Sequence, residues 1–140
     1  MSIEDIFETL VAEFFTRDPY VFIHEQYSIK DSAAGEWSCP DFVALNFRDH
    51  VVSVVEVNTA YKPEGLLEKV GNCDRQWLDL LRAQLAKRSI ADGWNYRVEV
   101  FVRRAAVEAV KAKAGNRPDV LVHTLEELKH PWEWDWPAAD

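Results

Sequence analysis

PDFVALNFRDHVVSVVEVN, residues 40–58, is the stretch that decides the fold. Its two halves, Asp41–Arg48 and Val51–Asn58, are rich in branched and aromatic residues, which favour strands. Because only a short segment separates them, we expect them to pair as an antiparallel hairpin. A two-residue turn at Arg48-Asp49 is the simplest connection, although Arg-Asp is not a favoured pair for such a turn.

The register of this hairpin decides which side chains meet. With a turn at Arg48-Asp49, Val43 lies opposite Val54 and Asp41 lies opposite Glu56. A slip of one residue on one strand alone would send the two acids to opposite faces of the sheet. The interpretation of this acidic pair therefore depends directly on the register.

The segments on either side of the hairpin supply the other elements. Ser2 and Asp5 resemble a helix capping box, and apolar residues follow at helical spacing until Arg17-Asp18-Pro19. Residues 31–36 are typical of a loop, and the apolar period after the hairpin is interrupted near Gly71-Asn72. The expected elements are helices at Ile3–Phe15, Pro63–Ser89 and Arg104–Ala114, and strands at Tyr20–Tyr27, Tyr96–Val102 and Val120–His123.

The order of these elements, α-β-β-β-α-β-α-β, indicates the fold class. Strands separated by helices favour a mixed sheet with helices on both faces, a three-layer α/β/α sandwich. The chain has 140 residues, 48% of them hydrophobic, which is enough for one buried core. We therefore expect residues 1–140 to form a single domain with a Trp-rich tail at 131–140.

The composition and charge of the chain indicate its cellular location and limit the partners it could bind. No apolar stretch is long enough to span a bilayer and no basic leader starts the chain, which predicts a cytoplasmic protein without membrane contact. Cys39 and Cys73 are too few for a disulfide framework. The net charge of −8 disfavours non-specific nucleic-acid binding, but residues 75–117 hold 10 basic and 4 acidic side chains, a local charge of +6. That segment is either a basic surface or a set of ordinary solvated helix faces.

The acidic pair Asp41 and Glu56 is the candidate for a functional site, a divalent-metal site. Two carboxylates directly opposed on a hairpin repel each other, so a cation or a shared proton is needed to offset the repulsion. Mg²⁺ suits such a pair because it commonly binds one or two carboxylates and keeps waters for substrate phosphates, and Mn²⁺ is the alternative ion. The other interpretation is that both side chains lie at the end of the sheet and point into water.

The arrangement Pro40-Asp41, a hairpin, then Glu56-Val57-Asn58 resembles the PD-(D/E)XK signature of the restriction-endonuclease-like nuclease superfamily. The expected element order, over residues 2–123, is similar to the order in that superfamily. The resemblance implies a restriction-endonuclease-like fold, hydrolysis of DNA phosphodiester bonds, and Asp41 and Glu56 as metal ligands.

The resemblance also assigns roles to residues around the pair. Asn58 stands where the superfamily usually has a lysine, and a neutral amide can orient water but supplies no positive charge. Lys62 or Lys69 would have to supply that charge, unless both are solvated surface lysines. Glu13 is the candidate for the additional metal ligand that many members carry on the first helix, with a plain surface glutamate as the alternative.

Contacts to nucleic acid are expected from the basic segment. Gln76 corresponds in position to a helix glutamine found in one branch of the superfamily. Arg75, Arg82, Arg103 and Arg104 are candidates for phosphate contacts, with exposed salt bridges as the alternative.

The tail places Trp132, Trp134 and Trp136 at a period of two, with acidic residues between them. This pattern predicts an aromatic face that packs on the domain or forms a homodimer contact. Stacking on bases is less favoured because the neighbouring acids repel phosphates.

Three functional hypotheses follow from these residues. The first is a metal-dependent nuclease, the second is a catalytically inactive binding or regulatory module on the same fold, and the third is a structural protein with a fortuitous acidic pair. The missing lysine and the acidic balance favour the second, and the paired carboxylates favour the first.

Overall fold

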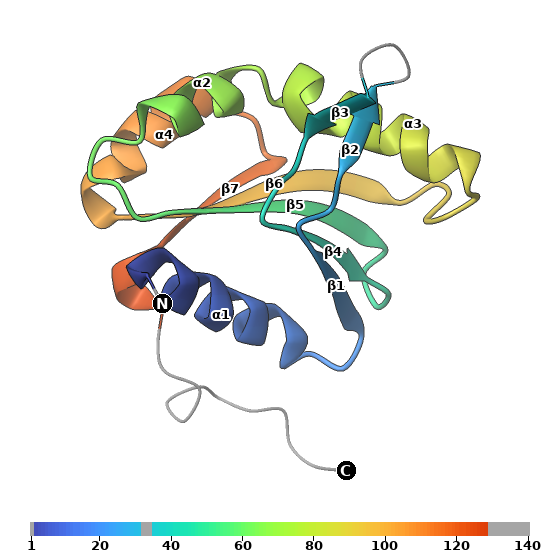
Figure 1. The fold of residues 1–140 in the computed structure, drawn as a ribbon, viewed down its shortest axis with the longest axis horizontal. Coiled ribbons are helices and arrows are strands. Elements are labelled where there is room, and N and C mark those ends of the chain that lie inside the picture. The colour runs from blue at the N-terminus through green and yellow to red at the C-terminus, as the bar shows by residue number, and fades with distance from the viewer. Residues whose placement is uncertain (1, 32–34, 129–140) are drawn as a thin grey trace.

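The computed structural model describes residues 2–31 and 35–128, which form a five-stranded sheet with helices on both faces (Figure 1). The sheet order is β1-β4-β5-β6-β7. The predicted Trp132, Trp134 and Trp136 contact lies outside the described residues. The strands of the sheet are β1 (Val21–Glu25), β4 (Phe42–Asn46), β5 (Val51–Asn58), β6 (Asn95–Val102) and β7 (Val120–Thr124).

Strand directions confirm the expected mixed sheet. β1, β4 and β5 form an antiparallel meander, while β5, β6 and β7 run parallel. In the β4–β5 hairpin Val43 pairs with Val54 and Leu45 with Val52, so the predicted register is confirmed. β5 is buried along most of its length because it is the central strand and is covered on both faces.

The turn of the hairpin differs from the expected two-residue connection. β4 ends at Asn46, which pairs with Val51, so the turn holds four residues. The Asn46 Oδ1 accepts hydrogen bonds from the backbone N–H groups of Arg48 at 3.0 Å and Asp49 at 2.9 Å. His50 then takes a left-handed conformation with φ 55°. The side chain of Asn46 thus replaces the turn chemistry that Arg-Asp lacks, and the register is unchanged.

The predicted element order is wrong at one point, between β1 and β4. Residues there form a separate two-stranded ribbon of β2 (Ile29–Asp31) and β3 (Gly35–Ser38), where we expected a loop. The ribbon is held from a distance: Gln84 Oε1 accepts the backbone N–H of Lys30 at 2.8 Å, and Ile29 is fully buried. Because these contacts come from residues far along the chain, the sequence of the ribbon itself carries no pattern that would predict its two strands.

The helices follow the predicted boundaries closely. The capping box of α1 (Ile3–Thr16) is confirmed, since Ser2 Oγ accepts the Asp5 N–H and the Asp5 carboxylate accepts the Ser2 N–H. The expected interruption near Gly71-Asn72 is also present. It separates the following elements: α2 (Glu64–Gly71), a π-helical turn (Asp74–Leu78) and α3 (Asp79–Lys87), with α4 (Val107–Ala114) after β6.

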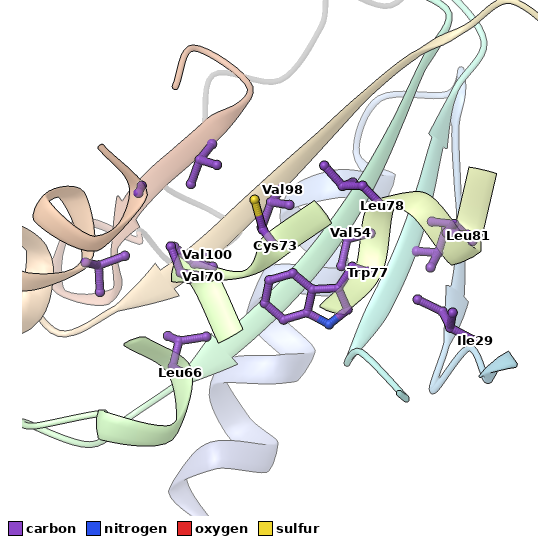
Figure 2. Close-up of a cluster of buried hydrophobic side chains, with 14 of the residues drawn as sticks. Ile29, Val54, Leu66, Val70, Cys73, Trp77, Leu78, Leu81, Val98 and Val100 are labelled. Atoms are coloured by element: carbon purple, nitrogen blue, oxygen red, sulfur yellow. The ribbon is translucent and has the colours of Figure 1, made fainter. Parts of the chain in front are cut away.

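Two apolar cores lie on the two faces of the sheet, which confirms the three-layer arrangement. α1 packs on one face through Val11, against Phe42 and Phe101. α2, α3 and α4 cover the other face, where the fully buried Trp77 lies in the middle of the cluster (Figure 2). In the described ranges no helix has the length and apolar character needed to cross a bilayer.

Candidate functional site

Asp41 and Glu56 lie together at one end of the β4–β5 hairpin. Asp41 directly precedes β4 and continues its register, which sets it across from Glu56 near the end of β5. An Asp41 carboxylate oxygen, Oδ2, accepts the backbone N–H of Val57 at 2.7 Å. A hydrogen bond from the backbone of β5 therefore fixes the position of this carboxylate.

The first helix adds another carboxylate, and it is Glu8. Burial, then the charge of Asp41 and a side-chain hydrogen bond with it, raise the pKa of Glu8 to about 7. Burial and the charge of Asp41 also raise the pKa of Glu4, one turn earlier. Glu13 instead is exposed, five positions beyond Glu8, which is a rotation of about 140° around the helix. The helix carboxylate beside Asp41 is thus Glu8 rather than the expected Glu13.

The topology contains a signal for Glu8 that the spacing did not reveal. A tight turn connects α1 to β1, so the two run in opposite directions, and β1 is antiparallel to β4. The N-terminal half of α1 must therefore lie over the end of the sheet where β4 begins. This places Glu4 and Glu8, not residues further along the helix, beside Asp41.

Among these carboxyl groups, the pKa of Glu56 is raised furthest above its ordinary value. Burial raises the pKa of Glu56 to about 8, the charge of Asp41 adds to the rise, and the charge of Glu8 contributes further. Lys69 and a hydrogen bond from the Asp41 backbone N–H act in the opposite direction. At neutral pH this group of carboxylates therefore retains a proton, because burial disfavours the charged form of Glu56 and the negative charges of Asp41 and Glu8 add to that effect.

These oxygens are the donors that a divalent cation of the Mg²⁺ type prefers, and a cation would remove the repulsion that the retained proton now relieves. The charge of Asp41 raises the pKa of both Glu8 and Glu56, and the charge of Glu8 also raises the pKa of Glu56. Within residues 2–31 and 35–128, however, no three acidic, histidine or cysteine side chains converge as a ready-made metal site. Asp41 Oδ2 is at the same time engaged by the backbone N–H of Val57.

Asn58 stands where the resemblance predicts a lysine. Asn58 Oδ1 accepts the backbone N–H of Ala60 at 2.9 Å, so its amide stabilises the turn that follows β5. Lys69, on α2, lies close enough to Glu56 for its charge to lower that pKa. Lys62 is exposed on the segment between β5 and α2. Of the two predicted lysines, Lys69 is the one whose charge reaches the pair.

Gln76 and Arg75 lie on the π-helical turn and contact β3. Gln76 Nε2 donates to Ser38 Oγ at 3.0 Å, and Trp37 Nε1 donates to the Gln76 carbonyl at 3.1 Å. The Arg75 guanidinium lies 5.1 Å from the centre of the Trp37 ring. These contacts hold β3, which precedes Pro40-Asp41 in the chain, against the helical layer.

The remaining predicted arginines lie at different places. Arg82 stacks over Tyr96 at 4.6 Å, on α3 and away from the carboxylates. Arg104 faces Glu127 at 3.8 Å, an exposed pair. Arg103, at the end of β6, donates from Nε to the Thr59 carbonyl at 3.1 Å and is therefore the arginine attached to the segment beyond Glu56.

A second buried glutamate, Glu99 on β6, belongs to a different group of side chains. His123 Nε2 lies 3.0 Å from its Oε1 and Arg97 Nε lies 3.6 Å from its Oε2. Burial raises the pKa of Glu99, but hydrogen bonds with His123 and Ser53 and the charge of Arg97 outweigh it, so the pKa falls below its ordinary value. These neighbours therefore stabilise the ionised form of Glu99 within the fold.

Comparison of the chain with protein-family models, curated protein sequences and solved structures gave no match. The function is therefore inferred from the geometry and electrostatics of the described residues.

Proposed function

We propose that this protein is a metal-dependent nuclease with a restriction-endonuclease-like fold that acts on DNA phosphodiester bonds. The observation that carries the proposal is that Glu8 and Glu56 both lie near Asp41 at one end of the central sheet, where burial, together with the charge of Asp41, raises the pKa of Glu56 to about 8. A fold selected for stability alone gains nothing from three acids in one place.

The chain's own residues divide the work of the proposed reaction. Asp41 and Glu56, with Glu8 as the third ligand, would hold Mg²⁺ or Mn²⁺, and the bound ion supplies a polarised water and positive charge at the phosphate. Lys69 provides a second positive charge beside Glu56, in place of the lysine that Asn58 replaces. The Val57 N–H keeps Asp41 directed towards the site.

One observation favours the alternative, a catalytically inactive binding or regulatory module on the same fold. The Asn58 amide is engaged with the Ala60 N–H, so the residue in the lysine position serves the turn rather than the chemistry. If Lys69 cannot approach a bound phosphate, the fold would bind a cation or DNA without cleaving it.

Metal titration and cleavage assays separate these functions. We expect Mg²⁺ or Mn²⁺ to bind the wild-type protein, as measured by calorimetry, and linear, branched or single-stranded DNA to be cut in the same ions. Asp41→Ala and Glu56→Ala should each abolish binding and lower cleavage more than about 100-fold. Glu13→Gln is the matched control, because Glu13 is on the same helix as Glu8 but faces away, and it should leave both unchanged.

The outcomes decide between the nuclease and the inactive binding module. Metal binding that survives in both alanine variants would overturn the metal site. Metal binding that is lost in both variants, with no cleavage of any DNA by the wild-type protein, would support the binding module and exclude the nuclease.

A further inference from the structure

Tyr61 is a large aromatic residue with most of its surface in solvent. It lies in the segment between β5 and α2, five residues after Glu56, and is 67% exposed. The guanidinium of Arg103 lies 5.2 Å from the centre of its ring. The ring is therefore held on a cation while much of its surface remains open to a ligand.

Arg103 is itself fixed from two further directions. Its Nε donates to the Thr59 carbonyl at 3.1 Å, and its guanidinium lies 5.6 Å from the centre of the Phe7 ring. Phe7 directly precedes Glu8 on α1, and Thr59 directly follows Asn58. The Tyr61–Arg103 pair is thus attached to both elements that carry the proposed catalytic carboxylates.

The chemistry of this pair fits an unpaired nucleobase. A base inside a duplex is already stacked on both sides, whereas the face of an unpaired base is free to lie on an aromatic ring, and such stacking tolerates any sequence. Arg103 and the neighbouring exposed Lys62 supply positive charge for the adjoining phosphates. In a chain with a net charge of −8, non-specific attraction to DNA is weak, so stacking supplies affinity that charge cannot.

We propose that Tyr61, supported by Arg103, is a stacking platform for an unpaired base, and that the protein engages single-stranded DNA or unpaired DNA ends beside its carboxylates. This inference rests on the proposed function for the meaning of the site, since it names the substrate class of that reaction. The binding step itself requires no metal.

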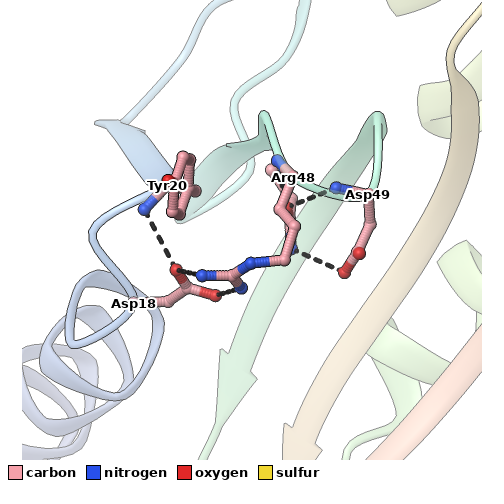
Figure 3. Close-up of polar contacts among 5 residues, drawn as sticks. Asp18, Tyr20, Arg48 and Asp49 are labelled. Atoms are coloured by element: carbon pink, nitrogen blue, oxygen red, sulfur yellow. Dashed lines mark hydrogen bonds and ion pairs between the residues drawn. The ribbon is translucent and has the colours of Figure 1, made fainter. Parts of the chain in front are cut away.

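The molecule provides a matched control at the other end of the hairpin. Tyr20 is 53% exposed and its ring lies 4.6 Å from the guanidinium of Arg48. Arg48 is held by Asp18 through two hydrogen bonds (Figure 3). Tyr20 therefore reproduces the exposed ring on an arginine, but next to the turn of the hairpin and away from Asp41 and Glu56.

Fluorescence anisotropy with labelled oligothymidylate and a blunt hairpin duplex, both in EDTA, tests the platform. Tyr61→Ala should weaken binding of the single strand about tenfold or more, and Tyr61→Trp should retain it. Tyr20→Ala should bind like the wild-type protein, and the duplex should bind weakly in every variant. Unchanged single-strand binding in Tyr61→Ala, or equal binding of duplex and single strand, would overturn the inference.

Cleavage in Mg²⁺ distinguishes this inference from the proposed function. If DNA is cut but Tyr61→Ala leaves the ratio of single-strand to duplex cleavage unchanged, the platform is excluded and the nuclease stands. If nothing is cut but single strands still bind through Tyr61, the nuclease is excluded and the platform stands.

Discussion

Glu56 and Glu99 are two glutamates on neighbouring parallel strands, and their environments perturb them in opposite directions. Glu99 is 5% exposed, yet its pKa lies below the ordinary value because His123, Ser53 and Arg97 compensate its charge. Glu56 is less enclosed, yet its pKa is raised to about 8 because burial and Asp41 both oppose ionisation. Burial alone therefore does not decide the direction of the pKa shift. The partners do, and a charge left uncompensated by the fold is available for a ligand.

The largest effect that tests this comparison is the loss of the Glu99 carboxylate. Glu99→Ala should lower the free energy of unfolding by about 3 kcal/mol, because His123 and Arg97 lose a buried partner. Urea unfolding at pH 7 measures it. Glu108→Ala, an exposed position on α4, is the control and should change little. A Glu99→Ala protein as stable as the wild type would show that this cluster is not the compensated site described above.

Removal of the Glu56 charge should stabilise the protein, whereas removal of the Glu99 charge should destabilise it. Its folded-state pKa of about 8 lies above the ordinary 4.5, so between these values the folded protein keeps a proton that the unfolded chain has released. Stability contributed by this group is fully present below pH 4.5 and is lost as the pH rises through about 8. Glu56→Gln removes the penalty and should stabilise the metal-free protein at pH 9 on the order of 2 kcal/mol.

Unfolding of Glu56→Gln in EDTA at pH 5 and pH 9 measures this difference. The gain should disappear at pH 5, where the wild-type glutamate is already neutral in the folded protein. Glu13→Gln should show no such pH-dependent gain. A variant that is destabilised at pH 9, or stabilised equally at both pH values, would contradict the uncompensated environment of Glu56.

The sequence was sufficient for the parts of this contrast that local patterns encode. The apolar runs at 41–48 and 51–58, joined by a short turn, pair in the predicted register, and this register brings Asp41 to Glu56. The capping box of α1 was likewise predictable from Ser2 and Asp5. These features depend on residues a few positions apart.

What the sequence did not reveal depends on contacts between distant segments. The β2–β3 ribbon is anchored by Gln84, 54 residues beyond Lys30. Glu8 was missed because its role follows from how α1 lies across the sheet, and Glu99 because its partner His123 is on another strand. The restriction-endonuclease-like assignment and the nuclease activity stay predictions.

The smallest expected effect concerns Lys69, the residue that partly compensates Glu56. Its charge lowers the pKa of Glu56, so Lys69→Met should raise that pKa by a few tenths of a unit, equivalent to about 0.5 kcal/mol for an exposed lysine. Titration of the Glu56 carboxyl carbon by NMR measures the change. Lys62→Met, which removes a nearby exposed lysine from outside α2, should leave the titration as it is.

This small change in the pKa of Glu56 tests whether Lys69 supplies the positive charge that the proposed function requires. If Lys69→Met moves the Glu56 titration and Lys62→Met does not, a positive charge is available beside the carboxylates despite Asn58, as the proposed reaction requires. If neither substitution moves it, Glu56 lacks a cationic neighbour altogether. The contrast with Glu99 would then be complete, and a site that binds a metal or DNA without cutting would be the better account of this fold.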